Sequence, residues 1–129
     1  MSLSGESEMD AELFEVLVIE ALDSLPPEFG RQLRNVEIQV QPRPTGEHRR
    51  SVRLRPGQTL YGLYEGVPLT ERVGGAPMLP DVITIFQEPL ERDFPNLDQL
   101  RAQVRRTVLH ELAHFFGISD ARLRELDAY

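Results

Sequence analysis

Two histidines and a glutamate lie close together in the segment TVLHELAHFFGISD, residues 107–120. His110 and His114 are four positions apart, and Glu111 directly follows the first histidine. In an α-helix, residues four apart lie on one face, so the two imidazoles can share one metal ion. Glu111 lies about 100° further around the helix, where it can reach a water molecule on that metal. The HExxH pattern therefore predicts a zinc site with a glutamate as general base.

A catalytic zinc site needs a third protein ligand and keeps a fourth position for water. Gly117 can adopt the left-handed conformation that ends a helix and turns the chain back. Asp120 follows three residues later, where a reversed chain can return to the metal. We therefore predict that Asp120 is the third ligand and that one zinc ion binds per chain. Two alternatives stay open: Glu125 as the third ligand, or Asp120 as a first-turn residue of a short C-terminal helix.

The segment HELAHFFGISD resembles the extended signature of zincin metallopeptidases that turn at a glycine, with aspartate where a third histidine is more common. Together with GLYEGVPLTER and LPDVITIFQEPL, it resembles the minimal zincins, a family of small bacterial single-domain proteins identified as zinc metallopeptidases. The likeness covers roughly residues 60–129. It implies His110, His114 and Asp120 as ligands, Glu111 as general base, and a peptide or protein as substrate. The methionine turn of the larger glycine-turn zincins has no counterpart here, because all three methionines precede the motif.

The zincin resemblance also implies where a substrate would lie. In zincins the substrate extends along the sheet edge that precedes the active-site helix and adds to it as a strand. The corresponding residues here would be Val82, Ile83, Thr84, Ile85, Phe86 and Gln87. Peptide hydrolysis also needs a hydrogen-bond donor for the oxyanion that forms at the attacked carbonyl. The candidate donors are Tyr61, Tyr64, Tyr129 or an arginine.

The helix that carries the motif is predicted over residues 97–116, because its polar and apolar residues separate onto two faces. His114, Gln103 and Arg106 all fall within about 40° of His110, on one side of it or the other. The opposite face is apolar and consists of Val104, Val108, Leu109, Leu112, Phe115 and Phe116. We expect the apolar face to pack on a sheet and the histidine face to border a cleft.

The remaining elements are predicted from periodicity and from turn residues. Helices are expected over residues 10–25, near 26–35 and over 119–127, and strands over 36–40, 51–55, 59–65 and 81–87. Residues 41–50, 71–80 and 88–96 are expected to be loops or connectors. This order predicts an α+β, zincin-like fold with a small twisted mixed sheet packed on the active-site helix and an N-terminal helix. We expect a disordered leader over residues 1–8 and a single domain over residues 9–129.

Charge and composition restrict the partners. The chain has 129 residues, a formal net charge of −7 and no cysteine. A net negative charge disfavours nucleic acid and anionic membranes, and the lack of cysteine excludes disulfides and thiolate ligands. We expect a cytoplasmic protein with no nucleic acid or membrane partner. His48 and the basic residues around it are interpreted as a solvated surface; the basic residues are Arg43, Arg49, Arg50, Arg53 and Arg55.

A second function belongs to a different class. The metal could stabilise a non-catalytic protein-interaction module, and the histidines could also lie on an ordinary amphipathic helix. Glu111 distinguishes the peptidase from the interaction module, because a purely structural zinc site needs no base and has all four coordination positions filled by protein.

Overall fold

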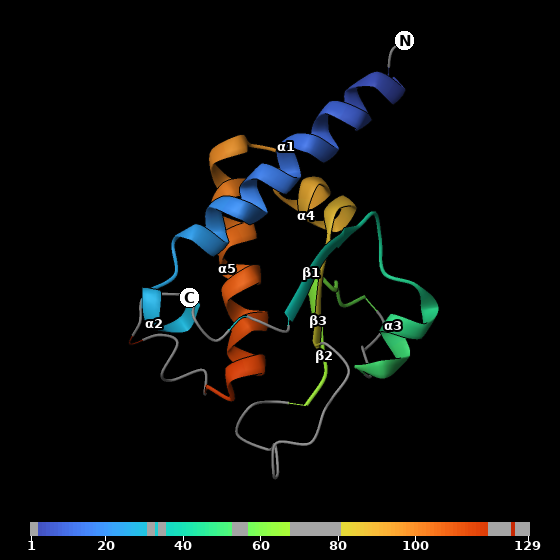
Figure 1. Ribbon diagram of the computed structural model, residues 1–129. Coiled ribbons are helices and arrows are strands. Elements are labelled where there is room, and N and C mark those ends of the chain that lie inside the picture. Colours follow the sequence, from blue (N-terminus) through green and yellow to red (C-terminus); the bar gives the residue numbers. More distant parts are fainter. Residues whose placement is uncertain are drawn as a thin grey trace.

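A computed structural model describes residues 3–30, 33, 36–52, 57–67, 81–118 and 125 of the chain. Along these residues the elements are α1 (Leu3–Asp23), α2 (Pro27–Gly30), β1 (Val36–Gln41), α3 (Gly46–Ser51), β2 (Gly62–Glu65), β3 (Asp81–Phe86), α4 (Gln87–Asp93) and α5 (Leu97–Phe116). Figure 1 shows α5 on one side of the sheet and α3 on the other, with α1 crossing α5. The predicted α+β class is confirmed.

The sheet has the strand order β1-β3-β2. β1 runs parallel to β3 and β2 runs antiparallel to it, so the predicted mixed sheet is confirmed. Ile83, for example, lies opposite Ile38 on one side and Tyr64 on the other. β3 is therefore the central strand of this sheet.

This topology corrects the predicted substrate strand. A strand with hydrogen-bonded neighbours on both sides has no free backbone edge that a substrate could join. The residues concerned are Val82, Ile83, Thr84, Ile85 and Phe86, together with Gln87, which begins α4 instead. The near-continuous apolar run in DVITIF is typical of a strand covered on both faces, and its side chains from Ile83 to Phe86 are fully buried. Among the described strands, β2 forms the edge of the sheet next to α5.

The helix α5 has defined signals at both ends. The Asn96 side chain caps its start by accepting hydrogen bonds from the backbone N–H groups of Asp98 and Gln99 at 3.0 and 3.2 Å. Gly117 ends it in the left-handed conformation, with φ at 73°. The Ile118 N–H then donates to the Ala113 carbonyl at 2.9 Å, as in a Schellman turn. The predicted helix and the predicted role of Gly117 in stopping it are both confirmed.

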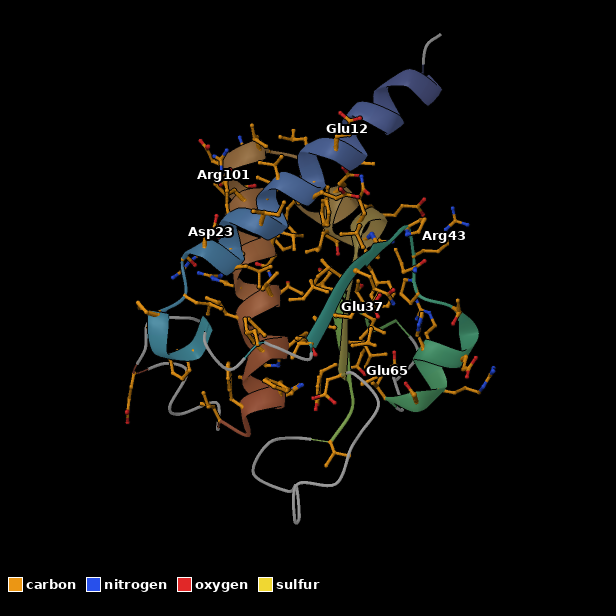
Figure 2. The ribbon with its side chains drawn as sticks, in the orientation of Figure 1. Glu12, Asp23, Glu37, Arg43, Glu65 and Arg101 are labelled. Carbon is orange, nitrogen blue, oxygen red and sulfur yellow. The ribbon has the colours of Figure 1, made fainter. Side chains whose placement is uncertain are left out.

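The hydrophobic core lies where α1, α4 and the sheet meet α5. The predicted apolar face of α5 is confirmed, since Val104, Val108 and Leu112 are buried in this core. From the other elements the core takes Phe14, Leu17, Val18, Ala21, Ile83, Ile85 and Leu90. At the surface, Arg101 of α5 (labelled in Figure 2) places its Nε 3.1 Å from the carboxylate of Glu20 in α1. Packing of α1 and the sheet thus covers the apolar face of α5 and leaves its histidine face outside the core.

Four local predictions differ from the structure. Helix α1 begins at Leu3, so residues 3–8 are helical although a disordered leader was expected there. Residues 46–51 form α3, although a loop was expected over residues 41–50. The strand expected over residues 51–55 is not present at Ser51, which ends α3, and residues 53–55 lie outside the described part. Residues 87–93 form α4 where a connector was expected.

No helix in the described ranges is long and apolar enough to cross a membrane.

Candidate functional site

The two histidines and Glu111 come together on the outer face of α5. The ring centroids of His110 and His114 are 4.8 Å apart. One carboxylate oxygen of Glu111 lies 3.3 Å from Nδ1 of His114. Glu111 is only 7% exposed, whereas the His114 side chain is 49% exposed. The histidine pair is therefore accessible from solvent, while the carboxylate beside it is held in the protein.

The histidine face of α5 forms one wall of a pocket of about 280 Å³. From α5 the pocket is lined by Gln103, Arg106, Thr107, His110 and Glu111. The facing wall consists of residues 59–62, which lead into β2. The predicted cleft beside the histidine face is therefore present, and the edge strand β2 forms part of it.

The pocket wall approaches α5 closely at Gly62. A Cβ atom at this position would lie 2.8 Å from Cγ2 of Thr107 and 3.1 Å from Cγ of Glu111. Thr107 cannot easily rotate away, because its hydroxyl donates a 2.8 Å hydrogen bond to the Gln103 carbonyl. Only glycine leaves room for this contact, so Gly62 positions the backbone of β2 directly against Glu111. Sequence reasoning missed this residue, although a glycine inside a strand often marks such an approach.

Replacement of Gly62 tests this close contact. Gly62→Ala is expected to lower the free energy of unfolding by about 1–3 kcal/mol, because the added methyl group overpacks the site. Gly30→Ala is the matched control: its added Cβ meets nothing within 4 Å, and we expect a change within about 0.5 kcal/mol. Urea unfolding followed by circular dichroism measures both. Equal stability of the two variants would show that β2 does not pack tightly on α5.

The tyrosine candidates for stabilising an oxyanion differ in their surroundings. Tyr61 lines the pocket, but its hydroxyl donates a 2.5 Å hydrogen bond to Asp93. Burial, helped by this bond, raises the pKa of Tyr61 to about 12, so it stays protonated at neutral pH. Tyr64 packs its ring against Phe115, with centroids 6.1 Å apart. Tyr129 lies outside the described residues.

The donor atoms at this site suit zinc. Two imidazoles one helical turn apart, with their rings edge to face, and an adjacent carboxylate are nitrogen and oxygen donors of the kind that zinc prefers. His110 and His114 therefore fit the metal that the motif predicts. Asp120, the predicted third ligand, lies outside the described residues. The alternative ligand Glu125 is described and exposed, and the described residues contain no set of three His, Asp or Glu side chains that could hold a metal.

The described basic residues around His48, namely Arg43, Arg49 and Arg50, do not line this pocket. Arg43 (labelled in Figure 2) forms two hydrogen bonds to the Glu88 carboxylate, at 2.8 and 3.0 Å. The hydrogen bond from Arg43 holds the pKa of Glu88 below its usual value. His48 and Thr45 form a capping box at the start of α3, and the His48 ring lies 5.1 Å from that of Phe86. Arg53 and Arg55 lie outside the described residues.

Comparison with known proteins agrees with this geometry. A family model described as zincin-like metallopeptidase matches residues 33–129, which include the sheet, the pocket walls and the whole HExxH segment. No curated protein matches the chain at a significant level. The match covers most of the 129 residues and contains every candidate site residue. The chain therefore belongs to the zincin-like metallopeptidase family.

Proposed function

We propose that the protein is a zinc-dependent peptidase in which His110, His114 and Asp120 hold one metal ion and Glu111 is the general base. The observation that carries this proposal is that His110, the half-exposed His114 and the nearly buried carboxylate of Glu111 lie together, with His110 and Glu111 lining one pocket. A site that only stabilised the fold would gain nothing from an ionisable carboxylate held beside the metal ligands.

Zinc in such a site supplies a Lewis acid and lowers the pKa of a water molecule towards neutrality. Glu111 accepts the proton from the attacking water and delivers it to the leaving amine when the peptide bond breaks. Its position supports both steps, because Gly62 and Thr107 restrict the side chain while its oxygen lies beside His114. The protein thus holds the proton acceptor in place before the substrate binds, which lowers the entropic cost of the reaction.

The proposed substrate is an extended peptide that lies in the pocket between residues 59–62 and α5. This placement replaces the predicted one along β3, which is paired on both sides. The pocket brings the wall that leads into β2 to within van der Waals contact of Glu111. A peptide bond beside that wall would therefore lie near the histidine pair and the base together.

A peptide library tests the proposed activity. The zinc-loaded protein is incubated with a mixture of defined peptides, and the products are identified by mass spectrometry. We expect cleavage that stops when a chelator removes the metal and returns when zinc is added back. Cleavage that persists in the chelator would contradict the proposal, and so would the absence of cleavage in a protein that retains zinc.

A further inference from the structure

Arg106 is a charged residue in the pocket wall that the proposed mechanism does not use. It lies one helical turn before His110 and lines the same pocket. It is exposed, and no ion pair joins it to any residue within the described ranges. Arg43, Arg92 and Arg101, in contrast, each contact a carboxylate within 4 Å. Within the described part of the chain, no carboxylate competes with a ligand for the guanidinium of Arg106.

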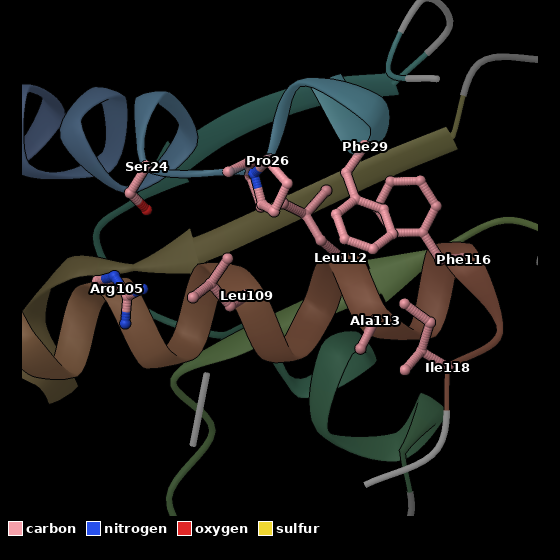
Figure 3. A pocket seen from close by; sticks show the side chains of 10 residues that line it. Ser24, Pro26, Phe29, Arg105, Leu109, Leu112, Ala113, Phe116 and Ile118 are labelled. Carbon is pink, nitrogen blue, oxygen red and sulfur yellow. The ribbon is translucent and has the colours of Figure 1, made fainter. Parts of the chain in front are cut away.

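The neighbouring residue Arg105 provides an internal comparison. It points to the other side of α5, where it borders a smaller, largely apolar cavity together with Phe29, Leu109 and Phe116 (Figure 3). Both arginines are exposed and belong to the same helix, so they differ mainly in which pocket they reach. Any effect that depends on Arg106 but not on Arg105 is an effect of the pocket beside the histidines.

The chemistry of Arg106 points to a carboxylate. A guanidinium binds a carboxylate through two parallel hydrogen bonds, which also fix its orientation. The other side chains of the pocket wall that carry or can gain a charge are His110 and Glu111, which the proposed mechanism uses for the metal and for proton transfer. Because the whole chain has a net charge of −7, an anionic ligand is attracted only at short range. Arg106 would thus affect the dissociation rate and the orientation of a bound substrate more than its association rate.

The spacing of Arg106 and His110 along α5 indicates where the contacting carboxylate would lie on the peptide. Four residues of helix rise about 6 Å, and an extended peptide advances about 3.3 Å per residue. For side chains that project to the same extent from α5, a carboxylate that contacts Arg106 belongs to a residue about two positions from the bond beside His110. A glutamate or aspartate side chain satisfies this limit, and so does the terminal carboxylate of a short peptide product or substrate.

We propose that Arg106 forms a subsite for a substrate carboxylate within about two residues of the scissile bond. This proposal rests on the proposed function, since it takes the histidine pair as the site of cleavage. It assigns the enzyme a preference for acidic peptides or for peptides that end close to the cleaved bond.

Binding, measured without turnover, tests the subsite. The zinc-loaded Glu111→Gln variant is titrated with fluorescein-labelled octapeptide libraries that carry either Glu or Gln at one fixed position and are otherwise equally randomised. We expect about tenfold tighter binding of the Glu library for at least one position, as measured by fluorescence anisotropy. The additional Arg106→Gln substitution should remove this preference, and Arg105→Gln should leave it unchanged. Amidated peptides form a second arm: a preference that disappears only on amidation identifies the terminal carboxylate as the ligand.

The outcomes separate this proposal from the proposed function. Equal binding of the Glu and Gln libraries with no effect of amidation, a preference that survives Arg106→Gln, or no measurable binding of any library would overturn the subsite. Cleavage of peptides by the wild-type protein without such a preference would overturn the subsite alone. Arg106-dependent binding in a wild-type protein that cleaves nothing would instead overturn the peptidase and leave a carboxylate-binding site.

Discussion

Glu111→Gln is expected to reduce peptide hydrolysis by about 10²–10⁴-fold while zinc binding remains, because a glutamine cannot accept a proton from water. The substitution keeps nearly the same volume, so the close packing against Gly62 is preserved. The loss should appear in kcat, since the carboxylate acts in the transition state and not in holding the peptide. The measurement is a steady-state rate on any peptide that the library identifies, with zinc content determined on the same sample.

The result of that experiment also decides between the two classes of function. Unchanged hydrolysis in the variant would show that Glu111 is not the base and would remove the main support for the proposed mechanism. Zinc retained by both proteins, with hydrolysis in neither, would favour the metal-stabilised interaction module. Thermal unfolding of the two proteins is the control, because a lower melting temperature of the variant would show that lost activity reflects lost structure.

A second large effect is expected from the metal ligands. The wild-type protein, loaded with zinc and dialysed, should retain about one zinc per chain. His114→Ala and Asp120→Ala should each weaken zinc binding by more than about 100-fold, because loss of a residue that only supports a ligand already costs about 10–100-fold. His114 is half-exposed, so its removal should change the folding of the zinc-free protein little. Mass spectrometry of metal content after dialysis measures the effect directly.

Glu125→Ala is the matched control for the third ligand. Glu125 is the other carboxylate that the sequence offered for this position, and the structure shows it exposed and not grouped with the histidines. We expect the Glu125→Ala protein to keep its zinc. Loss of zinc in this variant, with retention in Asp120→Ala, would exchange the assignments of the two carboxylates.

Long periodic patterns were predicted correctly from the sequence because they carry a complete local signal. In α5 the apolar positions recur at helical spacing, Asn96 caps the start and Gly117 supplies the left-handed turn at the end. β1 alternates between Val36, Ile38 and Val40 on the core side and polar residues between them, so it was also recognised. For these elements, burial of one face and the local backbone preference favour the same conformation.

Two short helices, α3 and α4, were missed because they have little periodic signal. α3 buries no residue, and its start depends on the reciprocal hydrogen bonds between Thr45 and His48. α4 contains Pro89, and a proline in the sequence predicts a break in a helix. Pro89 is nevertheless the third helical residue, where the backbone N–H has no partner within the helix, so proline is tolerated. Contacts with the rest of the fold stabilise α4, since Pro89 and Leu90 are buried.

By itself, the sequence predicts where two candidate metal ligands and a base lie, because the spacing of side chains along a helix follows from helix geometry alone. His110, Glu111, His114 and the stop at Gly117 are local features of about two helical turns and the following cap. Only the tertiary structure decided the order of the strands, which makes β3 central and places β2 beside the histidine face. It also decided that Gly62, far away in the sequence, lies against Glu111, and that residues 59–62 face Arg106 across the pocket. Strand order and close packing depend on contacts between residues far apart in the chain, and local periodicity carries no information about which of those contacts form.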